Sequence, residues 1–337
     1  YYNVIFYVLY FQSQQASIHR PFYYRKGHKR GKRLGEHGKY CNLHTPIVEN
    51  RGNIVISIAE EKEYNNVMIT IKNNELKVEI TEDGAELRSI VFKGKEYLYQ
   101  GDCTWKRRAP ILFPWAGRLR DLEYTYDGEK YHMGQHGFAR DMRFNVIEKE
   151  EDRVNMMIQS DASTLVIYPR PFKLYMEYKV EGNSLRVKMS VENLGEKEMT
   201  YGIGIHPGFI IEDRDASLYI EGGNEDAIIL DANGKRVREE NVRERLPLSF
   251  FSDNTTLIVP DAKEVIAKGK DRTIVLNLVS FKNLVVWRSE NDPFICLEAW
   301  DNLPSKEGEE ENFNTRSNVV RQKPISTRQF ESIFSFL

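Results

Sequence analysis

His206 is the residue in this chain whose type and position best suit proton-transfer chemistry. It follows the apolar stretch Met199–Ile205, which we predict to be a β-strand, and a Pro-Gly pair then ends that strand. Gly202 and Gly204 leave one side of the strand without side chains, so that another group can approach the backbone. A histidine there can donate or accept a proton near neutral pH. The alternative is a histidine that is only hydrogen-bonded at a strand end.

A carboxylate, Glu298, ends a second apolar strand, predicted at Phe294–Glu298. Such a carboxylate either points outward to water or needs a partner inside, and the sequence leaves both possibilities open. In a cleft, partial burial would raise the pKa of Glu298 toward values that suit a general base. Arg118, which we expect nearby, would lower that pKa again.

Two other segments carry polar side chains where a core strand would not. The first, ILFPWAGRLRD, holds Arg118 and Arg120, and the second, GQHGFARD, holds His136 and Arg140. Either segment suits the edge of a pocket, although surface positions and ion pairs are the alternatives for the arginines. His132 lies in the polar, hairpin-like stretch YDGEKYHMG, and we expect it at the surface.

The tryptophans and cysteines allow both structural and functional interpretations. Trp115 and Trp300 would offer flat faces to a sugar ring, or would pack in the core or at a rim. Cys103 and Cys296 are interpreted as small apolar residues, with a reactive thiol as the alternative. With Cys41 they make three cysteines, too few for a complete disulfide framework and without metal-ligand spacing. We therefore expect no metal, no cofactor and a reducing cytoplasm as the location.

Charge divides the 337 residues unevenly. Residues 1–67 hold 10 Lys and Arg against 5 Asp and Glu, whereas residues 68–337 hold 38 against 45. The acidic balance of the larger part argues against a nucleic-acid partner. The apolar run at the start is too short to span a membrane, and its positive charges follow it, unlike those of a signal peptide.

The two parts are expected to differ in order as well. Residues 1–67 show no sustained helical or strand periodicity of apolar residues, and they hold eight Lys and Arg between Arg20 and Lys39. They are predicted to be a basic, poorly ordered extension. A basic arm that recruits a macromolecule is the alternative. Residues 68–337 are predicted to form one domain, which begins near Met68.

The pattern from Met68 onward is that of an all-β protein. Short apolar-rich segments alternate with turn residues, and the last predicted strand ends at Glu298. Phe172–Glu181 and Ser184–Asn193 both alternate across a Gly-Asn link and are predicted to form a hairpin. So many strands favour two large antiparallel sheets packed face to face. No Gly-rich phosphate loop follows a strand, which disfavours a nucleotide site.

Five segments together resemble the aldose 1-epimerase (galactose mutarotase) superfamily, and within it the LacX-like branch. In chain order they are FPWAGRLRD, QHGFARD, YPRPFKLYMEYKVEGNSLRVKMSVEN, YGIGIHPGF and PFICLEAW. The resemblance covers roughly four-fifths of the chain, from about Met68 to the C-terminus, and implies a β-supersandwich with an open cleft for a hexose. Ala299 departs from the Glu-Pro-Trp that is usual in this branch.

The resemblance also implies roles for single residues. Glu298 would be the general base that removes the proton from the anomeric hydroxyl, and His206 the general acid that protonates the ring oxygen. The two would stand on opposite sides of one sugar ring. Arg118 and His136 would hold the sugar, and Asp253 is a loosely placed candidate for a further cleft aspartate.

Three functional hypotheses remain open at this point. The first is an aldose 1-epimerase that interconverts the anomers of a hexose, or of a hexose 6-phosphate held by Arg120 or Arg140. The second is a carbohydrate-binding protein that uses the same cleft without catalysis. The third is an adaptor recruited through the basic arm. The expected partner is a small sugar, with no nucleic acid and no membrane, and the chain is expected to be a monomer or homodimer.

Overall fold

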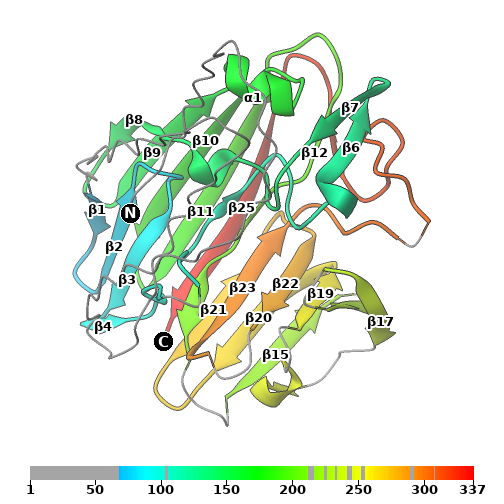
Figure 1. The fold of residues 1–337 in the computed structure, drawn as a ribbon. Helices are drawn as coiled ribbons and strands as arrows, with labels where there is room; N and C mark the ends of the chain where they lie inside the picture. The colour runs from blue at the N-terminus through cyan, green and yellow to red at the C-terminus, as the bar shows by residue number, and fades with distance from the viewer. Residues whose placement is uncertain are drawn as a thin grey trace, which may run out of the picture. The chain divides into compact units, whose positions relative to one another are not determined.

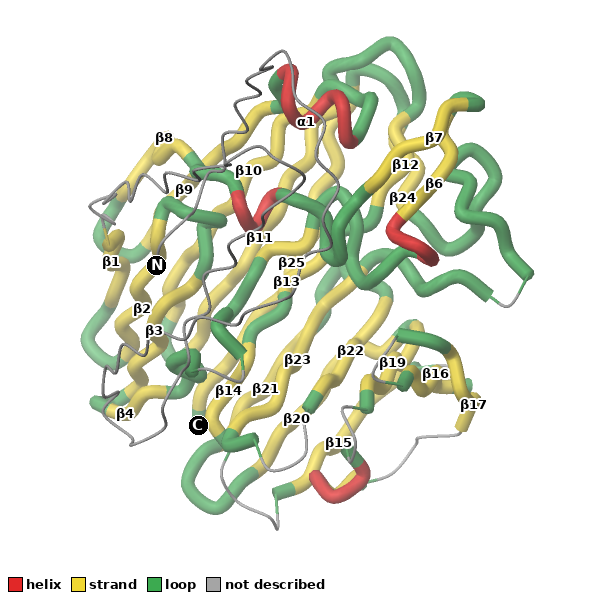
Figure 2. The backbone as a smooth tube through the Cα atoms, viewed as in Figure 1, coloured by secondary structure: helices red, strands yellow, loops and turns green. Residues whose placement is uncertain are grey.

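In the structure, a computed structural model, the regular secondary structure of the described residues is nearly all β-strand (Figures 1 and 2). These are residues 68–102, 105–211, 216–223, 226–231, 234–240, 245–251, 255–288, 292–306 and 308–337. The predicted extension (1–67), Cys103 and the candidate Asp253 lie outside them. In the part that is described, no helix is both long enough and apolar enough to cross a membrane. The all-β prediction is confirmed.

The first large layer is a nine-stranded antiparallel sheet. In spatial order its strands are β18 (Leu246–Pro247), β15 (Ser217–Gly222), β20 (Ala262–Lys268), β21 (Thr273–Asn277), β25 (Ser326–Phe336), β11 (Ser184–Asn193), β10 (Phe172–Glu181), β9 (Arg153–Gln159) and β8 (Asn145–Lys149). Along β10 every second side chain is buried, beginning with Phe172. This alternation gives the sheet one apolar face and one face with polar side chains.

The second large layer is an eight-stranded sheet. Its strands are β17 (Arg236–Glu240), β16 (Ala227–Leu230), β19 (Thr256–Pro260), β22 (Asn283–Trp287), β23 (Phe294–Trp300), β13 (Gly204–Ile205) and β5 (Ile111–Leu112), with β14 (Gly208–Ile210) also paired to β23. Strand β23 is buried along its whole length. It lies at the middle of this layer, between β22 and the β13–β14 segment.

Smaller elements complete the described residues. They are the sheet of β1 (Met68–Lys72), β2 (Leu76–Thr81), β3 (Leu87–Phe92) and β4 (Lys95–Glu96), the pair β6 (Glu123–Tyr126) and β7 (Glu129–His132), the pair β12 (Met199–Tyr201) and β24 (Val320–Gln322), helix α1 (Ala162–Ile167), and the 3-10 turns η1 (Arg120–Leu122), η2 (Ala139–Asp141) and η3 (Leu248–Phe250). His132 is exposed at the end of β7, as predicted.

One face of the eight-stranded sheet packs on the nine-stranded sheet. Leu297 and Ala299 of β23 belong to the same buried cluster as Leu174 of β10 and Phe334 of β25. Phe209 of β14 contacts Phe334 directly, with ring centroids 5.4 Å apart. The predicted pair of packed antiparallel sheets is therefore confirmed. The opposite face of β23 is left to carry other side chains.

The predicted hairpin is also confirmed. Strands β10 and β11 pair in register from Phe172 opposite Asn193 to Glu181 opposite Ser184. Gly182 of the two-residue link has φ +60°, a left-handed conformation that glycine adopts without strain.

Two strand predictions need correction. Strand β25, which pairs with β11 and β21 near the middle of the large sheet, lies beyond the last strand predicted from the sequence. The predicted strand Met199–Ile205 is instead two strands, because β12 pairs with β24 whereas β13 pairs with β23 and β5. Gly202 lies at the break. A Cβ atom there would be 2.2 Å from Oδ1 of Asn302, so the predicted close approach is real.

Candidate active site

Strand β23 places Glu298 on the face of its sheet that does not pack on the nine-stranded sheet. Successive side chains of a strand point to opposite faces, so Cys296, Glu298 and Trp300 share this face while Leu297 and Ala299 enter the core. The Glu298 side chain is only 1% exposed. Of the two possibilities that the sequence left open, the buried and partnered carboxylate is the correct one.

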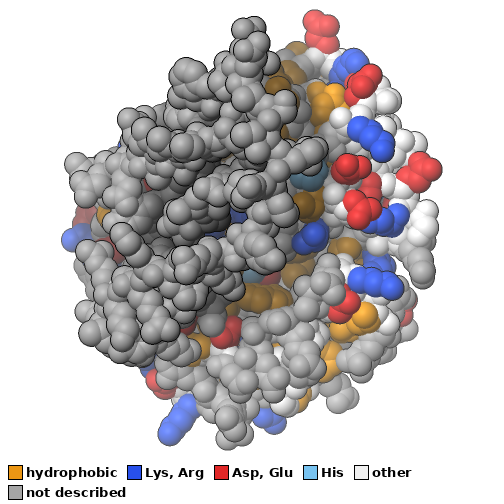
Figure 3. Space-filling model, in the orientation of Figure 1, with side chains coloured by type: hydrophobic (Ala, Val, Ile, Leu, Met, Phe, Trp, Pro, Cys, Tyr) orange, Lys and Arg blue, Asp and Glu red, His pale blue; other side chains and the backbone are white. Residues whose placement is uncertain are grey.

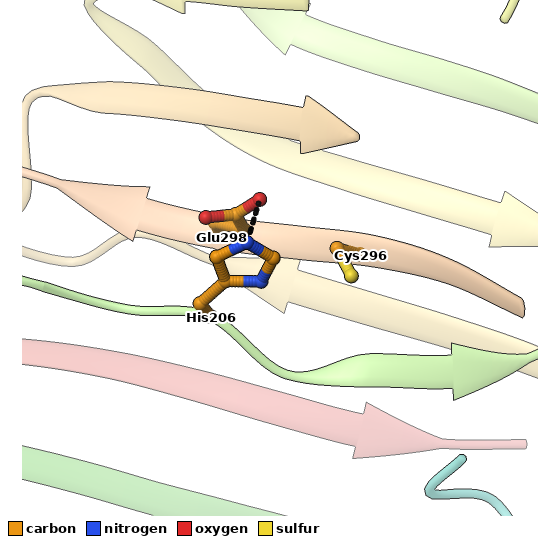
Figure 4. A group of neighbouring side chains, drawn as sticks. All are labelled: His206, Cys296 and Glu298. Carbon is orange, nitrogen blue, oxygen red and sulfur yellow. Dashed lines mark ion pairs between the residues drawn. The ribbon is translucent and has the colours of Figure 1, made fainter. Parts of the chain in front are cut away.

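His206 lies directly across from Glu298. Ile205 pairs with Ala299 and Gly208 pairs with Cys296, so two residues lie between these pairs on each segment, and the same register puts His206 opposite Glu298. Directly opposed residues share a face of the sheet. As a result, Nε2 of His206 is 3.3 Å from Oε1 of Glu298 (Figure 4).

The contact corrects one expectation about the pair. The resemblance implied an acid and a base on opposite sides of a sugar ring, whereas here the two groups lie side by side on neighbouring strands. The physical reason is the register, which puts both residues at one level of one sheet face. Even so, the 3.3 Å contact is not a hydrogen bond, and Oε1 of Glu298 and Nδ1 of His206 have no hydrogen-bond partner among the described residues.

Trp300 supports the carboxylate from the same strand. Its indole Nε1 donates a 2.8 Å hydrogen bond to Oε2 of Glu298. Burial raises the pKa of Glu298 well above the usual value, and the Trp300 hydrogen bond opposes this by stabilising the carboxylate. The expectation that Arg118 lowers this pKa is wrong, because Arg118 is exposed and the lowering contact comes from Trp300.

Burial favours the uncharged form of the His206 imidazole, as it favours the uncharged carboxyl of Glu298. It lowers the pKa of His206 from 6.5 to about 3, with a smaller lowering by the charge of Arg140. Burial thus favours a neutral imidazole and a protonated carboxyl, whereas their mutual contact favours the ion pair. Both forms hold the same number of protons, so the pair can pass from one to the other without exchanging a proton with solvent.

Aromatic rings enclose His206 on two sides. Trp105 lies with its ring centroid 5.2 Å from that of His206, and Trp287 of β22 lies at 5.9 Å in an edge-on arrangement. Gly208 makes room for Trp105, because a Cβ atom there would be 2.7 Å from its ring. Sequence reasoning missed both tryptophans. Neither has a telling spacing from His206, and only strand pairing brings them there.

His136 is close to the pair, as predicted, and its ring is 5.4 Å from that of His206. Its Nδ1 accepts a 3.1 Å hydrogen bond from the backbone N–H of Gly117. Burial, followed by the charges of His206 and Arg140, lowers the pKa of His136 well below its usual value. The neutral ring therefore carries its hydrogen on Nε2, which is the atom that can donate to a ligand. Nε2 lies 3.2 Å from the side-chain nitrogen of Gln135, also a donor, so the two bond only when the amide is turned to present its oxygen.

The other predicted residues are less close to the pair. Arg118 follows Gly117 but is exposed and makes no ion pair with a described residue. Arg120 donates to the backbone oxygen of Glu309, on a loop. Arg140 is half-buried, donates to the backbone oxygen of Gln135 and lies near enough to both histidines to lower their pKa values.

Trp115 and Trp300 are both buried and pack inside the protein. Trp115 stacks on Phe313, with the guanidinium of Arg316 4.6 Å from its ring. A separate polar cavity of about 700 Å³ lies past the end of β23 and is lined in part by Asp301 and Asn302, but neither Glu298 nor His206 lines it.

Comparisons with known proteins identify the family of this chain. A sequence profile of the family described as aldose 1-epimerase matches residues 67–318. This chain belongs to the aldose 1-epimerase family. Its similarity to the chromosomal protein LacX of Lactococcus lactis subsp. lactis is 32% identity over 286 residues, covering 77% of this chain and 96% of LacX. Membership of the family and of its LacX-like branch, as predicted, is therefore confirmed.

Solved structures of family relatives have the same fold. A galactose mutarotase related enzyme from Lactobacillus acidophilus superimposes with a TM-score of 0.76 at 25% identity, covering 80% of this chain and 97% of that one. A galactose mutarotase-like protein from Lactobacillus casei ATCC 334 gives 0.75 at 30% identity, covering 80% and 100%. The predicted β-supersandwich is confirmed for this member of the aldose 1-epimerase family.

Glycine is required where Trp300 reaches across to β13. A Cβ atom on Gly204 would lie 2.8 Å from both Cδ1 of Trp300 and the backbone oxygen of Ala299. Gly204→Ala is therefore expected to destabilise the protein by about 1–3 kcal/mol and to displace the indole from Glu298. Urea unfolding measures the first effect. Gly134→Ala, which adds a Cβ into open space, is the control and should change the free energy of unfolding far less.

Trp300→Phe should alter the protonation of Glu298. Loss of a hydrogen bond to a charged group costs about 1.5–3 kcal/mol, so the pKa of Glu298 should rise further and sugar turnover should fall roughly tenfold or more. The measurement is the pH profile of kcat/KM, whose alkaline limb should move to higher pH. Trp115→Phe removes an equally buried indole without a bond to Glu298, and a shift of the limb in that variant as well would contradict the assignment.

Proposed function

We propose that this chain is an aldose 1-epimerase that interconverts the α and β anomers of a free hexose. The observation that carries the proposal is the buried contact between Nε2 of His206 and Oε1 of Glu298, 3.3 Å apart, in which Oε1 of Glu298 and the other ring nitrogen of His206, Nδ1, have no hydrogen-bond partner among the described residues. Buried polar atoms are seldom left without a partner, and a ligand that bears hydroxyl groups supplies one. The anomeric hydroxyl and the ring oxygen of a pyranose are bonded to the same carbon, so an adjacent acid and base suit them.

In the proposed reaction, Glu298 as carboxylate takes the proton of the anomeric hydroxyl while His206 as imidazolium gives a proton to the ring oxygen. The bond between C1 and the ring oxygen breaks, and C1 becomes an aldehyde. Both protein groups are then neutral, which is the state that burial favours, whereas the ion pair that starts the step is favoured by the contact between the two groups. After rotation about C1–C2, attack of the hydroxyl on the other face of the aldehyde and return of both protons close the ring.

The neighbouring residues are proposed to position the sugar. His136 donates from Nε2 to a sugar hydroxyl in place of its contact with Gln135. Arg118, which is exposed and makes no ion pair with a described residue, is proposed to reach a hydroxyl at the rim. Asp253 stays a proposal for the same rim. Positioning of this kind lowers the entropy lost in reaching the transition state.

A phosphorylated hexose is the second candidate substrate. Arg140 is half-buried, and its charge acts on both His136 and His206, so it lies near the site. Arg120, the other arginine considered for this role, is instead held by Glu309. A hexose 6-phosphate would therefore depend on Arg140. Loss of turnover of the phosphorylated sugar alone in Arg140→Gln would favour this candidate.

The experiment that tests the proposal compares rates of anomer interconversion for glucose, galactose and glucose 6-phosphate, with the spontaneous rate subtracted. We expect acceleration of at least one of the free sugars. Rates at the spontaneous level for all three would contradict both candidates. The reaction is proposed to take place in a reducing cytoplasm, in keeping with three cysteines and no predicted disulfide framework.

No macromolecular partner is proposed for the domain. On the part of the face in Figure 3 that is not grey, Lys and Arg side chains are interspersed with Asp and Glu. The family match begins at residue 67, in keeping with the proposed separation of residues 1–67 from the catalytic domain. Deleting residues 1–67 is expected to leave sugar turnover unchanged, whether or not that segment recruits another molecule.

The pH dependence of turnover follows from the two shifts of pKa. The pair needs one shared proton. Below about pH 3 the imidazole of His206 gains a second proton and the pair has no base, and above the raised pKa of Glu298 the pair has no acid. We expect a flat profile of kcat/KM around neutral pH, with circular dichroism to check that the fold persists. A midpoint near 6.5, the ordinary pKa of histidine, would contradict this account.

A further inference from the structure

Cys296 completes a cluster of three possible metal ligands with the two residues already described. His206, Cys296 and Glu298 each offer one ligand atom, and these three atoms lie within 4.8 Å of one another (Figure 4). The three residues are buried. The proposed reaction uses the histidine and the glutamate but gives the thiol no part.

The arrangement follows from the strands and could not be read from the sequence. Cys296 and Glu298 stand two residues apart on β23 and point to the same face, and His206 comes from the neighbouring segment between β13 and β14. Figure 4 shows the thiol and the carboxylate both rising from β23 beside the imidazole. Separations of 90 and 2 residues match none of the usual ligand spacings, which explains why the sequence indicated no metal.

Each of the three side chains has an atom that no disulfide or hydrogen bond to a described residue occupies. Nδ1 of His206 and Oε1 of Glu298 make no hydrogen bond with a described residue, and Cys296 is a free thiol. Imidazole nitrogen, thiolate sulfur and carboxylate oxygen are the three ligand types that Zn²⁺ takes in proteins. Three protein ligands and one open position are typical of zinc sites that exchange their fourth ligand.

We propose that His206, Cys296 and Glu298 bind a Zn²⁺ ion, and that the bound ion blocks sugar turnover. Bond lengths of about 2.0–2.3 Å put tetrahedral ligands roughly 3.3–3.8 Å apart, so side-chain movements of about 1 Å close the site. The blocking effect rests on the proposed function, because the ion would occupy the lone pairs of both the acid and the base. Binding of the ion does not rest on it.

Charge at the ion itself is balanced. The thiolate and the carboxylate bring two negative charges, which neutralise the two positive charges of Zn²⁺, and Arg140, which acts on His206 from nearby, adds one positive charge outside the ligands. Burial, and then the charge of Glu298, raises the pKa of Cys296 well above its usual value. The free thiol therefore keeps its proton until the metal displaces it.

The test measures metal binding and sugar turnover separately, using the full chain. Co²⁺ serves as a visible probe, because a cobalt–thiolate bond gives a charge-transfer absorption, and competition with a chromophoric chelator gives the Zn²⁺ affinity. Cys296→Ala should lose that absorption and weaken Zn²⁺ binding roughly a hundredfold. It should still turn over sugar and should resist Zn²⁺, while wild type is inhibited. Cys296→Val, with circular dichroism, serves if the alanine variant folds poorly.

A double variant, Cys41→Ala with Cys103→Ala, controls for the other thiols in the chain. It should keep both the absorption and the inhibition. Equal Zn²⁺ affinity in wild type and Cys296→Ala, or a Co²⁺ spectrum without the thiolate absorption, would overturn the proposed site. If sugar turnover is absent from wild type while the thiolate absorption persists, the proposed function fails and the metal site stands.

Discussion

Replacing Glu298 by glutamine is expected to slow anomer interconversion by roughly 10²–10⁴-fold, the usual contribution of a positioned general base. The amide has nearly the shape of the carboxyl group and can still accept the hydrogen bond from Trp300 through its oxygen. It cannot take the proton of the anomeric hydroxyl. The loss should therefore appear in kcat, measured by polarimetry on freshly dissolved α-galactose.

Sugar binding provides the control for this variant. Because glutamine keeps the size and the hydrogen bond of the native side chain, the Kd for sugar by calorimetry should change little. A variant that binds sugar as tightly as wild type and converts it equally fast would support the alternative of a binding protein without useful catalysis. Circular dichroism separates both outcomes from loss of the fold.

Replacing His206 by glutamine is expected to cost a similar factor, roughly 10²–10⁴-fold, because the ring oxygen would lose its proton donor. Glutamine can still hydrogen-bond to a sugar but cannot deliver a proton. The acid limb of the pH profile, expected near pH 3 in wild type, should also disappear, since the titrating imidazole is gone. That signature would not follow from a merely structural role.

His132→Gln is the matched control, since His132 is an exposed histidine on β7, away from the core. It should leave both the rate and the pH profile unchanged. If His206→Gln retained the wild-type rate, the general acid would have to be another group, and His136, whose ring lies 5.4 Å away, would be the first to examine.

The sequence predicted the strands best where alternation was complete. The bounds of β10 and β11 were predicted to the residue, because buried and exposed side chains alternate over ten residues and a Gly-Asn pair closes the turn. Strand β25 was not predicted, although it lies near the middle of the same sheet. Its buried face includes Ser332, which interrupts the apolar pattern between Phe330 and Phe334.

The candidate site was predictable in its residues but not in its arrangement. The resemblance named Glu298 and His206, and local pattern placed each near the end of a strand. Their contact depends on the pairing register of two segments that lie about ninety residues apart in the sequence. The alternation of apolar and polar residues within one strand does not determine that register. The same holds for Trp300, whose hydrogen bond to the base could not be foreseen, and for Arg118, which was expected nearer to that base.

The paired carboxyl and imidazole groups are proposed to open and reclose the ring of a sugar. Magnetisation transfer between the two anomeric protons of galactose at equilibrium, recorded by NMR, measures this exchange directly and needs no coupling enzyme. We expect wild type to raise the exchange rate well above that of buffer, and Glu298→Gln to return it nearly to the spontaneous value. Exchange equally fast in wild type and in that variant, with both folded and both binding galactose, would contradict this proposal.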